Sequence, residues 1–301
     1  MNFLTAMFTQ EQIEHLEVWV NDGFFLLAMV VFVFELLRYA LKRKLTLNML
    51  GDSASNFITL AAFIAITSLI AALFYVAAFF FVFENFSIVQ LPITGWTIMA
   101  CLILADLAYY WEHRFAHRVN LAWASHTVHH SSPYFNISVA YRFGPLDGLL
   151  PFFFYLPLAM LGFNPLLIFF SEMIVQVYQT LLHTEAVKKL PRPIEWILNT
   201  PSHHRVHHAA NREYLDKNYA GILIIWDRIF GTFAEEKSTV RYGVFPRINS
   251  INPFTIFCHG YAKLFRQLWQ ANSWKARWHL LIKSPEWIWK HHQNRNCFQQ
   301  N

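Results

Sequence analysis

Charged residues are scarce in this chain. Only 14% of its 301 residues are Asp, Glu, Lys or Arg, whereas a soluble domain usually carries about 25%. Apolar residues make up 55%, so the composition indicates a membrane protein. The 24 Lys and Arg exceed the 19 Asp and Glu by a formal charge of +5. This mild excess fits a basic surface facing a membrane better than a nucleic-acid groove, and we expect no nucleic-acid partner.

Cysteine is also rare, and several nucleotide and redox motifs are missing. Cys101, Cys258 and Cys297 lie far apart and form no CxxC, so neither a disulfide framework nor a thiolate metal site is indicated. No GxGxxG, P-loop or CxxCH is present. The chain therefore has no recognisable module of its own for nicotinamide, nucleoside triphosphate or c-type haem.

Long apolar runs predict an all-α integral membrane protein with about four to five spanning helices. Residues 23–41 end in three basic residues at 42–44, which predicts a cytoplasmic C-terminal end for this helix and an N-terminus outside. Residues 57–83 carry no charge and predict one helix of about 40 Å that is tilted in the membrane or protrudes from it. Residues 93–112 predict the return to the cytoplasmic side.

The apolar region 145–182 predicts two further helices, because Pro157 and the Gly162–Pro165 turn interrupt it. Two spans here place His113–His130 and everything from His183 onward on the same cytoplasmic face. A single span would put the two histidine groups on opposite sides of the bilayer, which favours the paired interpretation.

This pattern divides the chain into three regions. Residues 1–92 are predicted to be an N-terminal membrane region with two spans, and residues 93–241 a catalytic region. Residues 242–301, rich in Trp, Lys and Arg, are predicted to be a cytosolic tail at the membrane interface. The predicted metal site lies in a helical cap on the cytosolic side.

Histidine is the unusual residue of this sequence, with 15 copies. Most of them fall in HRFAH, HTVHH and HHRVHH, which begin at His113, His126 and His203. An HxxxH spacing puts two imidazoles on one helix face, and HxxHH adds ligands at i and i+3 and another turned by about 100° that can reach a second metal. Neutral imidazole suits iron, zinc, copper or nickel, and eight or nine imidazoles exceed what one ion can hold. Two metal ions are therefore predicted.

Histidines outside these clusters are weaker candidates. His183 is isolated in sequence, so its spacing leaves a metal ligand and a hydrogen-bonded helix-end residue equally open. His203 is left out of the ligand set, because His204, His207 and His208 already complete an HxxHH. His259 lies outside every cluster and is predicted not to bind metal.

Other polar residues share the helix face of the first cluster. Asp106, Tyr110, His113 and His117 follow a helical spacing. Asp106 is costly within a span unless paired, which makes it a candidate acceptor for the N–H of a ligand imidazole. The alternative is a water-facing carboxylate at the membrane boundary.

From ADLAYYWEHRFAH at Ala105 to Phe233 the sequence resembles the fatty acid hydroxylase and sterol desaturase superfamily, whose members are integral-membrane di-iron oxygenases. More narrowly, it resembles the alkylglycerol monooxygenase branch. The segments that carry this narrower resemblance are NLAWASHTVHHSSPYFNISVAYR, LLHTE and NTPSHHRVHHAANREYLDKNYAGILIIWDRIFGTF.

The resemblance implies an O2-dependent di-iron oxidoreductase that acts on a lipid. It implies two iron ions held by His113, His117, His126, His129, His130, His183, His204, His207 and His208. Two electrons would come from tetrahydrobiopterin or an external electron donor, because the sequence has no cytochrome b5-like or ferredoxin-like segment. Further candidate catalytic residues are Asp106, Tyr110, Glu185 and Asn218, and Asp106 and Glu185 are predicted to offset the positive charge of the metals.

One position departs from the branch: alkylglycerol monooxygenases carry Glu directly after the second histidine of HxxxH, whereas this chain has Arg118. Cleavage of alkylglycerol ether lipids and hydroxylation or desaturation of a sterol or fatty-acyl lipid therefore stay open as alternatives. A metal transporter is disfavoured, because transport needs histidines or carboxylates near the midplane of several spans, and these histidines lie outside the spans on one face.

Overall fold

The computed structural model describes residues 7–70 and 74–298. These residues form helices and three isolated β-bridges but no strand, which confirms the all-α prediction. The α-helices are α1 (Gln10–Leu41), α2 (Leu47–Ile70), α3 (Val76–Phe86), α4 (Gly95–Arg118), α5 (Asn120–His126), α6 (Leu150–Met160), α7 (Pro165–Leu182), α8 (Arg192–Ile197), α9 (Pro201–His207), α10 (Ile225–Ile229), α11 (Pro253–Gln270), α12 (Trp274–Ile282) and α13 (Pro285–Phe298). Short 3-10 helices η3 (His129–Ser131), η4 (Ile137–Tyr141), η5 (Asp147–Leu149) and η6 (Arg212–Tyr214) lie between them.

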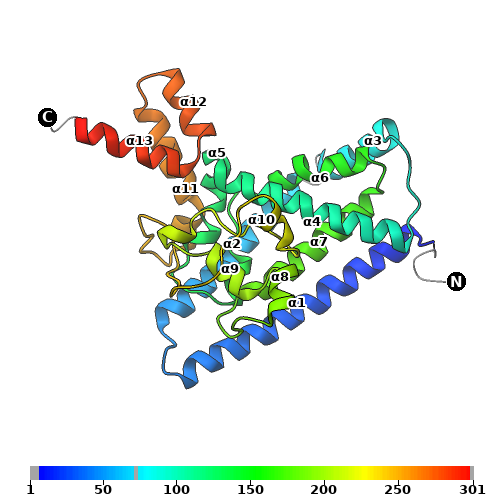
Figure 1. Cartoon of the computed structure of the whole chain (residues 1–301), viewed down its shortest axis with the longest axis horizontal. Coiled ribbons are helices and arrows are strands. Elements are labelled where there is room, and N and C mark those ends of the chain that lie inside the picture. Colours follow the sequence, from blue (N-terminus) through cyan, green and yellow to red (C-terminus); the bar gives the residue numbers. More distant parts are fainter. Residues whose placement is uncertain (1–6, 71–73, 299–301) are drawn as a thin grey trace.

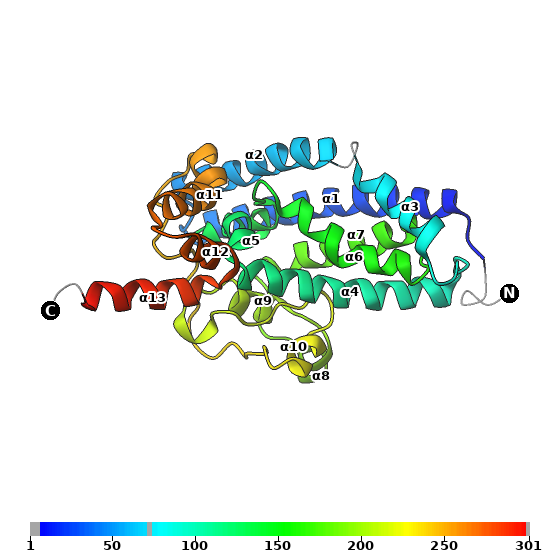
Figure 2. The same cartoon turned by 90° about the horizontal axis from the view of Figure 1, so that it is seen from above.

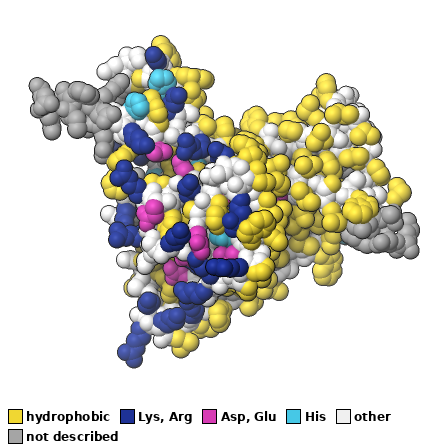
Figure 3. Space-filling view, in the orientation of Figure 1, with side chains coloured by type: hydrophobic (Ala, Val, Ile, Leu, Met, Phe, Trp, Pro, Cys, Tyr) yellow, Lys and Arg dark blue, Asp and Glu magenta, His cyan; other side chains and the backbone are white. Residues whose placement is uncertain are grey.

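Among the described residues, α1, α2 and α7 are long and apolar enough to cross a membrane. The apolar helices run along the long axis of the molecule (Figures 1 and 2). In Figure 3, hydrophobic side chains dominate the surface at the end of the molecule that contains α3 and α6. Charged side chains gather at the opposite end. This division of the surface is that of a protein embedded at one end and hydrated at the other.

Helix α1 begins earlier than the apolar run predicts. Thr9 accepts a hydrogen bond from the backbone N–H of Gln12, and the Gln12 side chain accepts one from the Thr9 backbone. This capping box starts the helix at Gln10, so a polar segment precedes the predicted span at 23–41.

Two predictions about helix breaks need correction. The uncharged run 57–83 is divided between α2 and α3, with residues 71–73 outside the described residues. Pro157 does not end a helix, because it lies inside α6. Helices α3 and α6 have 11 residues each, which corresponds to about 16 Å, roughly half of a hydrocarbon core.

The break between α6 and α7 at Gly162 is as predicted. Gly162 has a φ of +99°, and a Cβ at this position would lie 1.8 Å from the carbonyl oxygen of Val89. Only glycine fits such a close backbone approach. The turn reverses the chain, so α7 returns toward the end of the molecule at which α4 ends (Figure 2).

The core that positions the site lies between α4, α6 and α7. Helix α4 packs against both α6 and α7, and α7 also packs against α1. Buried Ala105, Ala108 and Tyr109 of α4 belong to the same apolar cluster as Tyr155 of α6 and Val175 of α7. The C-terminal ends of α4 and α7 consequently present their histidines to one another at the hydrated end.

Candidate metal centre

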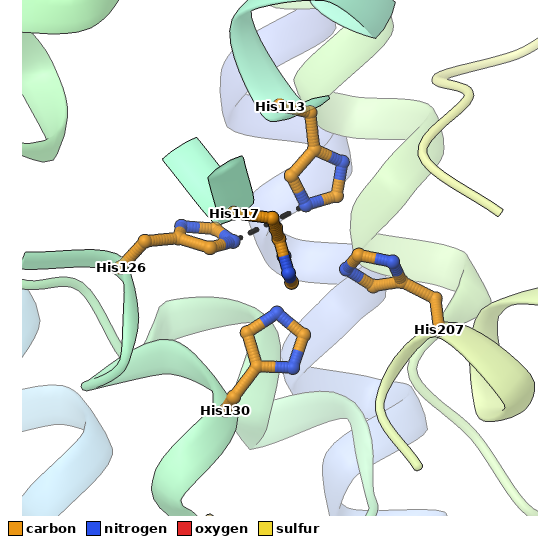
Figure 4. Close-up of side chains that lie close together, drawn as sticks. All are labelled: His113, His117, His126, His130 and His207. Carbon is orange, nitrogen blue, oxygen red and sulfur yellow. Dashed lines mark hydrogen bonds between the residues drawn. The ribbon is translucent and has the colours of Figure 1, made fainter. Parts of the chain in front are cut away.

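Nine histidines converge into two groups at this end of the molecule. The ring nitrogens of His113, His117, His126, His130 and His207 lie within 4.8 Å of one another, and so do those of His129, His183, His204 and His208. Figure 4 shows the five rings of the first group close together, with His117 in the middle of the view and the other four around it. These are the nine residues that the sequence pattern and the resemblance nominate.

The clusters divide between the groups in a regular way. His113 and His117 lie one turn apart on α4 and share the first group, as the HxxxH spacing predicts. In each HxxHH the histidines at i and i+4 stay together, and the one at i+3 joins the other group. This corrects the predicted pairing of i with i+3, because residues four apart are also neighbours on a helix face. Adjacent histidines point to different centres, as two metals require.

Backbone carbonyl oxygens fix the tautomer of several rings. His113 Nδ1 lies 2.9 Å from the carbonyl oxygen of Tyr219, and His207 Nδ1 lies 3.0 Å from that of Lys217. A carbonyl oxygen only accepts, so each Nδ1 carries the proton and each Nε2 keeps a free lone pair. Such second contacts orient the rings that bind a metal.

Backbone carbonyl oxygens also orient two rings of the second group, and here the Nε2 atoms face each other. His129 Nδ1 donates to the carbonyl oxygen of Arg142 at 3.2 Å, and His183 Nδ1 donates to that of Gln179 at 2.9 Å. The two Nε2 atoms then face each other at 3.2 Å with lone pairs on both. Two lone pairs at this distance repel unless a cation lies between or beside them.

Several ring nitrogens of the first group have no hydrogen-bond partner among the described residues. Among the described residues, the buried Nε2 atoms of His117, His130 and His207 have no hydrogen-bond partner. A buried polar atom without a partner costs free energy. All three belong to the first group. Convergent, unpartnered imidazole nitrogens fit a metal such as iron or zinc.

The protonation states agree with this interpretation. Burial lowers the pKa of His183 to about 3. Burial, followed by the charges of neighbouring imidazoles, holds the pKa values of His204 and His208 well below the usual range. These imidazoles are neutral near pH 7, which is the form that coordinates metal.

A carboxylate reaches the first group from a loop. Asp216 Oδ1 lies 3.9 Å from His117 Nδ1. Its Oδ2 accepts a hydrogen bond of 2.7 Å from Arg118 Nη1. The basic residue after HxxxH therefore holds an acidic residue beside the site.

The predicted contact of Asp106 with a ligand imidazole is wrong. Asp106 accepts hydrogen bonds from the backbone N–H of Ile222 at 2.5 Å and of Leu223 at 3.0 Å, and from Trp226 Nε1 at 2.8 Å. A Cβ on Gly221 would lie 2.4 Å from Asp106 Oδ1. The buried carboxylate thus holds residues 222–223 of the loop that follows Tyr219.

Three other candidate residues lie around the centre and outside both histidine groups. Tyr110 shares a hydrogen bond of 2.9 Å with Thr232 and accepts one from Arg114. Asn218 donates to the carbonyl oxygens of His203 and Ala234, at 3.1 and 2.7 Å. These contacts hold the loops that carry the ligands.

Glu185 lines a polar cavity of about 350 Å³ together with Arg205, Glu236 and Tyr242. It accepts a hydrogen bond from the Tyr39 hydroxyl at 3.2 Å. The Tyr242 ring stacks on Phe135 with 4.7 Å between ring centres. Phe135 in turn contacts the rings of His183 and His208. The cavity therefore lies one aromatic layer from the second group.

Histidines outside the two groups have other partners. His203 is buried and its Nε2 lies 3.1 Å from Glu195 Oε2. His259 Nδ1 donates to the carbonyl oxygen of Ile256. Neither belongs to a cluster of ligand nitrogens within the described residues.

Sequence reasoning missed the polar side chains behind the ligands. Arg142 is 1% exposed, donates to Asp52 and Asn56 of α2, and offers its own carbonyl oxygen to His129. Glu35 of α1 accepts from Thr184, the residue after His183. From the sequence, Asp52 and Glu35 can be recognised only as charged residues within apolar helices. Such residues are usually paired, but the sequence does not show with which residue.

Comparison with known proteins identifies the central region. Residues 98–232 match the model of the family described as fatty acid hydroxylase. This region belongs to that family. It contains all nine histidines of the two groups. The fatty acid hydroxylase region also lies inside the predicted catalytic region 93–241.

Individual relatives of the fatty acid hydroxylase region include alkylglycerol monooxygenases. The chain is 43% identical over 205 residues to that of Danio rerio and 41% identical over 206 residues to that of Homo sapiens, in each case across 68% of this chain and 46% of the relative. An ornithine lipid hydroxylase of Rhizobium tropici is 31% identical over 151 residues, which is 50% of this chain and 45% of the relative. The chain thus spans about half the length of these relatives. No solved structure matches.

Proposed function

We propose that this protein is a membrane-bound non-haem di-iron monooxygenase that hydroxylates an alkyl C–H bond of a lipid, with alkylglycerol ether lipids as substrates. The observation that carries the proposal is the pair of buried groups of converging imidazole nitrogens, three of which, in the first group, have no hydrogen-bond partner among the described residues. The similarity to alkylglycerol monooxygenases supports the choice of substrate.

The nine histidines are the proposed ligands of two iron ions. Two ions bound there would supply the activation of O2 and the transfer of two electrons. The chain itself orients the rings through the backbone carbonyls of Tyr219, Lys217, Arg142 and Gln179. Burial of the imidazoles excludes water from the centre.

The overall reaction balances as a monooxygenation followed by a spontaneous cleavage. O2, two electrons and two protons convert the ether CH2 to CH(OH) and form one water. The product is a hemiacetal, which breaks its C–O bond to give a fatty aldehyde and glycerol. The electrons come from tetrahydrobiopterin or an external donor, because the sequence contains no redox module of its own.

We further propose that the protein is multi-pass, with the metal centre on the cytoplasmic face. The ligands lie at the hydrated end of the helices, and the basic run 42–44 follows α1 at its C-terminal end. The excess of basic residues on cytoplasmic loops supports this orientation. Cysteine labelling from either side of the membrane at positions 118 and 189 tests it, because these exposed residues follow the histidine ends of α4 and α7 and both must react from the same side.

Metal analysis and a lipid assay test the main proposal together. Protein purified without O2 should hold two irons per chain, and overexpressed material can carry zinc, since histidine sites accept it. With O2 and a tetrahydropterin, the protein should release aldehyde from an alkylglycerol, and the variant His129→Ala should not. One metal per chain in active protein would overturn the di-iron centre.

A second candidate function is hydroxylation of another polar lipid. The similarity to the ornithine lipid hydroxylase favours it. Hydroxylated lipid formed without a pterin, together with no aldehyde from alkylglycerol, would support this alternative over ether cleavage.

A further inference from the structure

The helices α11, α12 and α13 form a C-terminal lobe at the hydrated end of the molecule. The lobe stands out to one side of the long axis along which the apolar helices run (Figure 1). None of its helices is among the described helices that are long and apolar enough to cross a membrane. A lobe in this place has one side turned toward the surface of the bilayer that holds the other helices.

Helix α11 carries an apolar stripe that the protein does not cover. Phe254, Phe265 and Trp269 are 75%, 66% and 79% exposed, and helical periodicity places them within about 60° of one another. The opposite side of the helix is packed tightly against α5, because a Cβ at Gly260 would lie 1.9 Å from the carbonyl oxygen of Ala124. The exposed stripe is therefore the outer face of a firmly held helix.

Helix α12 shows the same arrangement. Trp274, Trp278 and Ile282 follow one another at every fourth position, and all three are exposed. Leu280, on the other side of the helix, is buried. Exposed apolar stripes of this kind mark an interaction surface, and tryptophan is enriched at the headgroup level of membranes.

The lobe also carries an excess of positive charge. Residues 253–291 contain six Lys and Arg and one acidic residue, a formal charge of +5 that equals the charge of the whole chain. The acidic residue, Glu286, forms an ion pair with Lys290. The basic residues at exposed positions beside the two stripes are Lys263, Arg266 and Lys275. Basic side chains beside exposed aromatic rings are complementary to anionic lipid headgroups.

Hydrogen bonds fix the lobe beside the start of a candidate span. Ser55 of α2 donates to the carbonyl oxygen of Ile251, just before α11, and α11 packs against α2. The Asn120 side chain of α5 donates to the carbonyl oxygen of Leu280 in α12 at 2.8 Å. Because a spanning helix starts near the membrane surface, these contacts place the lobe close to the headgroups.

We propose that α11 and α12 bind an anionic lipid surface. Their apolar stripes lie among the headgroups and the upper acyl chains, and Lys263, Arg266 and Lys275 contact the negative groups of the lipids. A lipid surface fits better than a protein partner, because the tryptophans, the positive charge and the neighbouring span are together those of a membrane interface. The inference concerns a surface outside the metal centre and does not depend on the proposed reaction.

Lipid selectivity at the lobe tests the proposal. The full chain is placed in phosphatidylcholine nanodiscs with a fluorophore on Cys258, which lies on the α11 stripe; Cys101 is buried, and Cys297→Ser removes the third thiol. Trace lipid with a nitroxide high on its acyl chain and a phosphatidylglycerol or phosphatidylcholine headgroup quenches the fluorophore on contact. The anionic lipid should be preferred by about fivefold or more, which corresponds to one basic residue near an anionic surface.

Charge variants separate this preference from a general attraction to the protein. Lys263→Gln combined with Arg266→Gln should bring the preference toward one, and about 1 M salt should do the same, because exposed charges are screened. Lys188→Gln combined with Lys237→Gln is the matched control. It removes the same charge from exposed positions around the polar cavity, outside the lobe, and should leave the preference unchanged.

Apolar variants test the contact with the acyl chains. Phe265→Ser combined with Trp269→Ser, and Trp274→Ser combined with Trp278→Ser, should each weaken quenching by both lipids and leave the unfolding temperature unchanged, because the replaced side chains are exposed. Equal quenching by both lipids in wild type, or an undiminished preference in the charge variant of the lobe, would overturn the proposal. Self-association in detergent that disappears in the serine variants would also overturn it, since a second copy would then cover the stripes.

The outcomes separate this inference from the proposed function. Metal-free protein should show the same lipid preference, because the lobe lies outside both histidine groups. A preference that depends on the lobe charges, in a protein that oxidises no lipid, would support the surface and refute the proposed function. Lipid oxidation without any headgroup preference at the lobe would do the reverse.

Discussion

Arg118 and Asp216 form a hydrogen-bonded ion pair at the rim of the first histidine group, with Nη1 and Oδ2 2.7 Å apart. The second oxygen of the same carboxylate lies 3.9 Å from His117 Nδ1. The sequence pattern suggests that a cation replaces a carboxylate next to HxxxH. In the folded chain the cation anchors a carboxylate that comes from the loop after α9, so a carboxylate still lies beside the HxxxH histidines.

This pair predicts that Asp216→Asn weakens metal binding by about 10–100-fold, the usual effect of removing a side chain behind a ligand. Iron content after dialysis against a graded chelator measures the change. Glu286→Gln is the control, because Glu286 also faces Arg118, at 3.9 Å, and forms no ion pair with a histidine among the described residues. Equal metal retention in Asp216→Asn and wild type would contradict the role given to Asp216.

Because the nine histidines form two groups, each histidine variant is expected to lose the metal ion of its own group. His207→Ala removes a ligand of the first group and His129→Ala one of the second. Each should abolish turnover and lower the iron content toward one per chain, because no neighbouring side chain can replace the missing imidazole. His259→Ala should leave both nearly unchanged, since its ring lies outside the groups. Loss of activity in His259→Ala comparable to that in His129→Ala would refute the division.

The lowered pKa of His183 predicts how the metal-free protein responds to acid. Burial lowers its folded-state pKa from 6.5 to about 3, so between these values the unfolded chain binds more protons than the folded one. The stability of metal-free protein should therefore fall as the pH drops below about 6.5. Iron-loaded protein should resist to lower pH, because a bound metal stabilises the folded state.

Thermal unfolding with and without chelator, at about pH 7.5 and about pH 5, checks this expectation. A metal-free protein whose unfolding temperature is the same at both values would show that buried histidines do not limit its acid stability.

The sequence predicts which histidines cluster better than it predicts the helices. Histidine spacing identifies His113 and His117 as neighbours on one face, because helical periodicity alone decides it. The split of 57–83 and the continuation of α6 through Pro157 depend on packing against neighbouring helices, which a single segment does not reveal. Asp106 is correctly marked as a buried carboxylate, but its partners are 116 residues and more away in sequence.

The buried pair of Asp52 and Arg142 gives the second group long-range support. Their side chains are 3% and 1% exposed, with Nη1 3.0 Å from Oδ1. Arg142 also donates through Nε to the carbonyl oxygen of Val128 and to Ser131, so its side chain ties α2 to both sides of His129. Its backbone carbonyl accepts from His129 Nδ1. Loss of one partner leaves an uncompensated buried charge.

Asp52→Ala should consequently destabilise the protein by about 3–5 kcal/mol, and it should lower the metal content of the second group by releasing the HTVHH segment. Lys189→Ala is the matched control, since it breaks an ion pair with Glu235 whose partners are 43% and 51% exposed; such pairs contribute about 0–1 kcal/mol. Denaturant unfolding in detergent measures both variants, and metal analysis follows the ligand effect. A fully stable Asp52→Ala variant with normal metal content would mean that the His129 segment is held by its own local contacts and not by α2.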